Sequence, residues 1–429
     1  MEHNNTKKNG QYGFALFLIG CLFFIFGFIT WSNSQLIPYL KLACELSITQ
    51  SYYVATAFFA AYFVMAIPSS MVLKWTGFKK GMSLGLLVMA IGAALFIPAA
   101  QTRNYSLFLT GLFIIGTGLA LLQTASNPYV TVLGPMDSAA KRMSIMGICN
   151  KVAGILAVYV LGSITLSNAD ELKASLNGMS TIEKNAALSE LASRVIVPYA
   201  VIALILLILA VILYFIHLPE VHEEEENVAA TAVQKSSLFQ YPHLILGAIA
   251  IFFYVGVEVI SYDTFTGFGE SLGYSTVIAK NFASYTGYGL LVGYLLSIFA
   301  IPKYISQRKA LIIAILLSMA LVLGAIYTEG TTAVLCFALL GFSNSVMWPA
   351  IWPLALDGVG RFTKIGGALL IMGIVGGAVL PPLYGAFAEW LHTQELSTQT
   401  HQQVAYWIMI PCYLYLLYFA LKGYKAGKD

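Results

Sequence analysis

The stretch LLQTASNPYVTVLGP, residues 121–135, lies inside a long apolar segment and is nevertheless polar. It holds four polar side chains followed by a helix-breaking proline: Gln123, Thr124, Ser126, Asn127 and Pro128. An unpaired polar group in hydrocarbon costs several kcal/mol, so a helix surrounded only by lipid would be apolar on every face. We therefore predict that one face of this segment looks onto protein or a water-filled cavity.

The composition indicates an integral membrane protein. Hydrophobic residues make up 59% of the 429 residues, charged residues only 10%, and the mean hydropathy is +0.78. A soluble domain is about 45–50% apolar and about 25% charged. The polar N-terminus leads into an apolar run too long for a signal-peptide core, so we expect an uncleaved first helix. The five cysteines lack metal-type spacing, and we interpret them as small apolar packing residues.

Twelve apolar segments are long enough to cross a bilayer as helices. We place them at residues 13–38, 50–74, 80–100, 105–132, 142–166, 195–217, 243–268, 282–303, 309–328, 332–356, 364–390 and 404–422. The soluble-looking linker between the sixth and seventh carries the acidic run Glu223–Glu226. The predicted fold is an all-α membrane protein with 12 transmembrane helices in two pseudo-symmetric six-helix halves. The halves are residues 1–217 and 242–429, joined by a cytoplasmic linker at 218–241.

Lysines and arginines fall on alternate connections between these segments. Both termini and the central linker belong to the basic set, which includes Lys7, Lys79, Lys141, Lys235, Arg308, Lys364 and Lys425. The opposite connections are short or of mixed charge, as in the 168–194 loop with Asp170, Glu171 and Lys173. By the positive-inside rule, we predict that both termini are cytoplasmic.

The two predicted halves resemble each other in sequence. Pro128, near the end of the fourth segment, matches Pro349 in the tenth. The tripeptide Ile-Met-Gly at 145–147 in the fifth segment matches Ile-Met-Gly at 371–373 in the eleventh. A duplicated six-helix unit is typical of transporters that hold the substrate near the membrane midplane, between halves that rock around it.

These motifs identify a resemblance to the fucose/galactose/glucose symporter branch of the major facilitator superfamily. It covers nearly the whole chain and rests on QTASNPYVTVLGP (123–135), NYSLFLTGLFI (104–114), FFYVGVEV (252–259), GFSNSVMWPAIWPLAL (341–356), IMGIVGGAVLPPLYGA (371–386) and YFALKGYK (418–425). The resemblance implies the twelve-helix fold, alternating access, and uptake of a hexose-type sugar (glucose, galactose or mannose, for example) with a cation. It also implies a multi-pass protein of the bacterial cytoplasmic (inner) membrane.

Two residues depart from the fucose permease pattern. That pattern has an acidic residue in the first segment where this chain has Ser34, and a glutamate in the fourth where it has Gln123. A glutamine at that position looks like the glucose/galactose subgroup, some of whose members use sodium. The proton mechanism of the fucose permease therefore cannot be carried over, and the coupling ion, H⁺ or Na⁺, stays open.

Three ionisable residues lie well inside apolar segments: Lys151, Glu258 and Asp263. Such residues are costly at a helix centre, so they usually face the interior, are paired, and mark a function. Lys151 departs from the family pattern. One interpretation is a structural ion pair or a side chain that snorkels to an interface. The other is that Lys151 belongs to the coupling chemistry with Glu258 or Asp263, either replacing the coupling cation or carrying a proton. Asp263 lies nearer the outer end of its segment, where we expect it to be solvated.

Sugar hydroxyls are bound by planar amide and carboxylate side chains, and sugar C–H faces by aromatic rings. The candidates for the sugar site are Asn33, Gln35, Gln123, Asn127, Asn150, Tyr254, Glu258, Asn344, Trp348 and Trp352. Trp348 and Trp352 are spaced i, i+4 and should stack on one helix face. Gln123 and Asn127 share that spacing and should point the same way.

Other functional classes fit less well. There is no nucleophile elbow, phosphate-binding loop or zinc motif, so we predict no enzymatic activity, no cofactor and no metal site. The duplicated halves disfavour a channel. A sugar uniporter, or a sugar sensor on the same fold, would keep the pocket and stays an alternative. The expected partners are a small-molecule sugar and the lipid bilayer, with no nucleic acid, and we expect a monomer.

Overall fold

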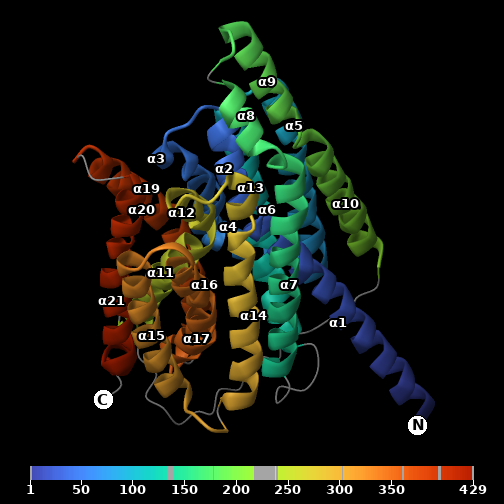
Figure 1. Cartoon of the computed structure of the whole chain (residues 1–429). Helices are drawn as coiled ribbons and strands as arrows, with labels where there is room; N and C mark the ends of the chain where they lie inside the picture. The colour runs from blue at the N-terminus through green and yellow to red at the C-terminus, as the bar shows by residue number, and fades with distance from the viewer. Residues whose placement is uncertain are drawn as a thin grey trace.

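The computed structural model describes residues 2–132, 139–176, 178–216, 237, 240–301, 303–359, 362–394 and 398–427. Over these residues the regular structure is entirely helical, and the helices form one elongated bundle (Figure 1). Both chain termini lie at one end of the bundle, which we call the terminal face. The other end carries α3 (Ile48–Ser51), α8 (Ala169–Leu176), α9 (Thr181–Ser193) and α13 (Thr276–Ala279), and we call it the distal face.

We call the helices before the linker the N-terminal group. Besides α3, α8 and α9, they are α1 (Glu2–Trp31), α2 (Asn33–Ala43), α4 (Tyr53–Ala94), α5 (Phe96–Gln101), α6 (Tyr105–Val132), α7 (Ala139–Thr165) and α10 (Ile196–Phe215).

The helices after the linker are the C-terminal group. Besides α13, they are α11 (Pro242–Asp263), α12 (Phe265–Ser271), α14 (Phe282–Ala300), α15 (Gln307–Tyr327), α16 (Gly330–Asn344), α17 (Met347–Leu356), α18 (Thr363–Met372), η4 (Gly373–Val375), α19 (Gly376–His392), α20 (Thr398–Ala405), η5 (Tyr406–Ile408), α21 (Met409–Leu421) and η6 (Gly423–Lys425).

Within the described residues, 11 helical segments are long and apolar enough to span a membrane. One of them, Tyr53–Gln101, has 49 residues. At about 1.5 Å per residue it is more than twice as long as the hydrocarbon core is thick. It contains a break at Gly77, whose φ of 72° and ψ of 171° are not helical. Only glycine adopts such a φ without steric cost, so the chain reverses there and this segment supplies two of the twelve predicted spans.

Residues 121–132 of the polar stretch are helical, and α6 continues past Pro128 to Val132. The predicted fourth span, 105–132, therefore has the same bounds as α6, with Pro128 inside the helix. The polar side chains of α6 have three different environments. Gln123 lines a cavity, the Thr124 hydroxyl donates to the carbonyl of Ala120 in its own helix (2.7 Å), and Ser126 is fully buried. One face of the helix does look onto protein and a cavity.

Candidate functional site

A cavity of about 130 Å³ lies between the two helix groups. Its lining has four aromatic residues, three aliphatic residues, two amides, one threonine and one glutamate: Thr30, Trp31, Phe59, Tyr62, Gln123, Asn150, Val255, Glu258, Val259, Trp348 and Ile374. The first six come from α1, α4, α6 and α7, and the other five from α11, α17 and η4. A few polar groups on an otherwise apolar wall are the usual composition of a small-molecule site.

An ion pair joins the two groups at the edge of this cavity, with Glu258 on the lining and Lys151 outside it. Lys151 Nζ on α7 donates to Glu258 Oε1 on α11 at 3.3 Å, and the two side chains are only 9% and 10% exposed. The ammonium also lies 4.2 Å from the centroid of the Trp31 ring, within the range of a cation–π interaction. Lys151 therefore does not snorkel, and of the two carboxylates left open by the sequence it pairs with Glu258 and not with Asp263. Its charge is balanced inside the protein by Glu258. This geometry fits both a structural ion pair and a part in coupling.

The indole of Trp31 is held from three sides. Its Nε1 donates to Asn150 Oδ1 at 3.3 Å, and its ring lies 4.3 Å from the ring of Tyr262. Underneath it is Gly154, where an added Cβ would come within 2.5 Å of the indole Cδ1. Any larger residue at position 154 would collide with the indole. Three residues of α7 thus position the Trp31 ring: Gly154 leaves space for it, Asn150 accepts its hydrogen bond, and the Lys151 ammonium lies near its face.

A tryptophan pair on α17 contributes one ring, that of Trp348, to the cavity lining. The rings of Trp348 and Trp352 are stacked, with centroids 5.3 Å apart, so the stack predicted from their i, i+4 spacing is present. Trp348 reaches the cavity, and the buried ring of Tyr254 lies 6.2 Å away from it. The Trp348 ring in the lining is thus supported by two further rings, those of Trp352 and Tyr254.

Four of the sequence candidates line the cavity: Gln123, Asn150, Glu258 and Trp348. The structure brings these together from α6, α7, α11 and α17. Tyr254 and Trp352 stand behind Trp348 and not on the lining itself. The side chain of Asn127 lies outside the described residues, so its shared direction with Gln123 stays a prediction.

Three other candidates are buried away from the cavity lining. Asn33 is fully buried, and its amide makes no hydrogen bond among the described residues. Gln35 donates through Nε2 to the carbonyl of Lys280 at 2.7 Å, on the distal side of the bundle. Asn344 accepts through Oδ1 from the hydroxyls of Tyr413 (3.0 Å) and Ser318 (3.2 Å). Gln35 and Asn344 therefore connect helices, and none of the three lines the cavity.

Asp263 is buried, with 3% of its surface exposed, and the expectation that it is solvated was wrong. It is the last residue of α11, as its sequence position suggested. However, α12 begins two residues later and continues the bundle, so the end of α11 is covered by protein. Its Oδ2 has no hydrogen-bond partner within the described part of the chain.

The sequence of this chain matches one known protein family over most of its length. The model of the Major Facilitator Superfamily matches residues 18–381, most of the chain. The chain belongs to the Major Facilitator Superfamily.

Within this superfamily, the chain is similar to proteins named for sugars. It is 36% identical to a "Glucose/galactose transporter" of Brucella abortus, over 99% of this chain and 97% of that protein. It is 31% identical to the "L-fucose-proton symporter" of Escherichia coli, over 90% of this chain and 89% of that protein. Its fold matches the outward conformation of the E. coli transporter FucP with a TM-score of 0.72 and 29% identity, covering 96% of this chain and 98% of that chain.

Seven lining residues of this Major Facilitator Superfamily protein were not among the sequence candidates: Thr30, Trp31, Phe59, Tyr62, Val255, Val259 and Ile374. Aromatic residues in an apolar segment have no distinguishing pattern, because the same residues face lipid elsewhere in the chain. For Trp31, the signal was its position directly before the polar run Ser32 to Gln35 in the first segment. A polar run marks a protein-facing stretch, and its aromatic neighbour shares that environment.

Proposed function

We propose that this protein is a symporter of a hexose-type sugar that works by alternating access. The amides of Gln123 and Asn150 would bind sugar hydroxyls, and the indoles of Trp31 and Trp348 would pack against the sugar's C–H faces. The observation that carries the proposal is the Lys151–Glu258 ion pair, since it joins the two helix groups at a cavity lined by these side chains. The relatives named for glucose, galactose and fucose support the substrate class.

We propose further that residues 1–217 and 242–429 move as two six-helix halves joined by the 218–241 linker. Both termini would be cytoplasmic in the bacterial inner membrane, which makes the terminal face of the bundle the inner one. The charge bias of the connections supports this orientation. The transporter would act as a monomer, because the cavity is complete within one chain.

The coupling proposal concerns the proton. With Ser34 and Gln123 in place of acids, Glu258 is the carboxylate left at the cavity wall among the described residues. When its oxygen Oε1 takes up a proton, the carboxylate loses its charge and the attraction to the Lys151 ammonium falls. The two groups can then separate, and re-forming the ion pair expels the proton to the side that is open. A proton symporter among the relatives supports H⁺ over Na⁺ as the coupling ion.

The test is sugar uptake into proteoliposomes, with glucose, galactose, mannose, fucose and N-acetylglucosamine, under a pH gradient or a Na⁺ gradient. We expect one or more hexoses to accumulate with the pH gradient. In Glu258→Gln, uphill accumulation should be lost while exchange of labelled for unlabelled sugar continues, because the variant cannot release a proton. Glu190→Gln is the matched control, since Glu190 is exposed and is not among the residues that line the cavity.

The other outcomes each point to a different function. Accumulation driven by Na⁺ alone would contradict proton coupling through Glu258. Equilibration without accumulation would indicate a uniporter. Binding of a hexose without any transport would indicate a sensor on the same fold.

A further inference from the structure

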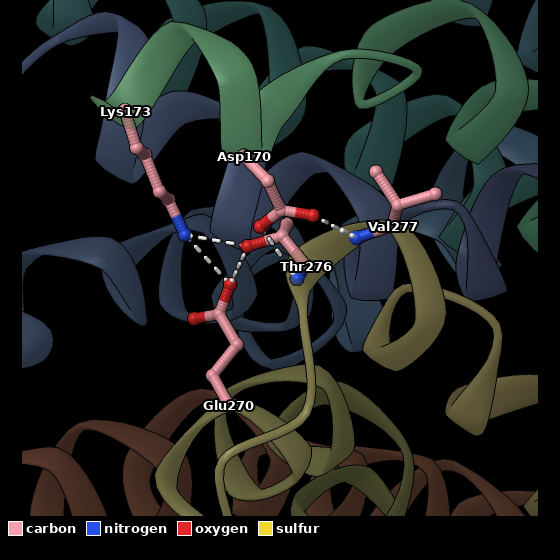
Figure 2. Close-up of polar contacts among 5 residues, drawn as sticks. All are labelled: Asp170, Lys173, Glu270, Thr276 and Val277. Carbon is pink, nitrogen blue, oxygen red and sulfur yellow. Dashed lines mark hydrogen bonds and ion pairs between the residues drawn. The ribbon is translucent and has the colours of Figure 1, made fainter. Parts of the chain in front are cut away.

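A polar cluster joins the two helix groups at the distal face and contributes no residue to the cavity lining. Figure 2 shows its five residues, Asp170 and Lys173 from α8 and Glu270, Thr276 and Val277 from the C-terminal group. In the sequence, the first two belong to the mixed-charge connection at 168–194. Such charges are commonly solvated, so their contacts with another part of the chain are informative.

Asp170 binds the backbone at the start of α13. Its Oδ1 accepts from the amide of Thr276 at 2.8 Å, and its Oδ2 accepts from the amide of Val277 at 3.0 Å. One carboxylate of the N-terminal group therefore satisfies two amides of the C-terminal group that have no helical acceptor. A charged acceptor makes shorter and stronger hydrogen bonds than a neutral one.

Lys173, one turn further along α8, makes the reciprocal contact. Its Nζ lies 2.8 Å from Glu270 Oε1 on α12 and 2.6 Å from the hydroxyl oxygen of Thr276. That hydroxyl in turn donates to Glu270 Oε1. Each group thus supplies a carboxylate to donors of the other group, and Thr276 takes part in both contacts.

A second layer lies deeper on the same side of the bundle. Gln35 on α2 donates through Nε2 to the carbonyl of Lys280 at 2.7 Å, and Lys280 Nζ donates to the carbonyl of Leu166 at 3.4 Å. These bonds also run between the two groups. Opening the cavity towards the distal face would require both layers to separate.

We propose that α8 is a latch that holds the distal face closed, with Asp170 and Lys173 gripping α12 and α13. The latch forms when the cavity faces the terminal side and opens when it faces the distal side. This inference rests on alternating access and on no particular sugar or coupling ion. It assigns the 168–194 connection a part in the transport cycle.

The experiment measures the opening directly. Spin labels are placed at two exposed positions that flank the cluster, Ala174 on α8 and Ile278 on α13, in a variant lacking the five native cysteines. Distance distributions are recorded without sugar. Asp170→Ala should raise the ratio of long to short distances about tenfold, the change expected when a hydrogen bond to a charged group is lost.

Glu171→Gln is the matched control, because Glu171 is exposed on the same turn of α8 and its substitution removes the same charge as Asp170→Ala. It should leave the distribution as in the parent. Lys173→Gln and Glu270→Gln should each lengthen the distances, and the double variant should add little to either single one, since both remove the same contact.

A distance distribution that stays the same in Asp170→Ala and Lys173→Gln as in Glu171→Gln overturns the proposal. Because the measurement needs neither transport nor substrate, this result is separate from any failure of the proposed symport. The uptake assay and the distance measurement therefore test the two proposals separately. A symporter of another solute would fail the hexose assay and could still show the latch, whereas a hexose symporter without the latch would show the opposite.

Discussion

Two lysine–glutamate pairs join the same two helix groups and differ in their surroundings. Lys151 and Glu258 are 3.3 Å apart, with side chains 9% and 10% exposed. Lys173 and Glu270 are closer, 2.8 Å apart, with side chains 41% and 26% exposed. By distance alone, the second pair is the stronger one.

Burial reverses that order of importance. An exposed ion pair contributes about 0–1 kcal/mol, because water screens it and solvates either partner alone. A buried pair gains little over an apolar pair, but losing one partner leaves a buried charge that nothing solvates. The central pair is therefore suited to respond to a single proton, and the distal pair to close and open with small energy changes.

The sharpest way to break this comparison is to remove each lysine with the same substitution. Lys151→Met should destabilise the protein by about 3–5 kcal/mol, because Glu258 is left charged and buried. Lys173→Met should cost less than about 1 kcal/mol, because water replaces the ammonium at Glu270. Thermal unfolding of the purified protein in detergent measures both, and a large fall in melting temperature is expected only for Lys151→Met.

The double variant Lys151→Met/Glu258→Leu supplies the check on that explanation. With both charges gone, most of the lost stability should return while accumulation of sugar stays absent. If the double variant were as unstable as Lys151→Met alone, the cost would come from packing around the lysine stem and not from an uncompensated carboxylate.

Much of the fold followed from the sequence, because each prediction depended on one segment at a time. Segment length located the spans, and the i, i+4 spacing predicted that Trp348 would stack on Trp352. The sequence predicted a connection between the second and third spans, but not that it would be as short as a single non-helical residue, Gly77. A glycine in a predicted turn does not show how closely the two flanking helices approach it.

The site was harder, because it is made by helices that meet in space. Which carboxylate Lys151 pairs with depends on how α7 faces α11, and no periodicity within either helix contains that information. The burial of Asp263 depends on α12 covering the end of α11. The grip of Asp170 on α13 joins residues about a hundred positions apart, so its charge looked like an ordinary solvated loop charge.

A second prediction concerns the Trp31 ring, which lies beside the Lys151 ammonium of the central pair. Gly154→Ala places a methyl group 2.5 Å from Trp31 Cδ1, so the indole must move and its contacts with Lys151 and Asn150 change. Overpacking of this kind costs about 1–3 kcal/mol, and sugar affinity should fall about tenfold. Quenching of tryptophan fluorescence by the transported hexose measures the affinity. Gly147→Ala on the same helix is the control, since its added Cβ would meet only Tyr294 at 4.0 Å; equal losses in both variants would contradict a role for the Trp31 contact.

The smallest expected effect is the pH response of the distal cluster. Burial raises the pKa of the Asp170 carboxyl, but the hydrogen bonds from the Val277 and Thr276 amides and the charge of Lys173 outweigh it, so the pKa is lowered in the closed state. Glu270 on α12 and Lys280 after α13 are the other charged groups near it.

A carboxyl whose pKa is lowered on closing favours the closed state at every pH above its ordinary value of about 3.9, and this advantage is lost as the pH falls through the lowered value. The distance between labels at Ala174 and Ile278 should therefore stay constant from about pH 8 to about pH 5 and lengthen only in stronger acid. In Asp170→Asn the acid-induced change should disappear, because no proton is left to bind. A transition between pH 6 and 7 in the parent would mean that a group other than Asp170 controls the latch. The distal cluster would then respond to protons near neutral pH, as we propose only for the buried central pair, and the contrast between the two pairs would fail.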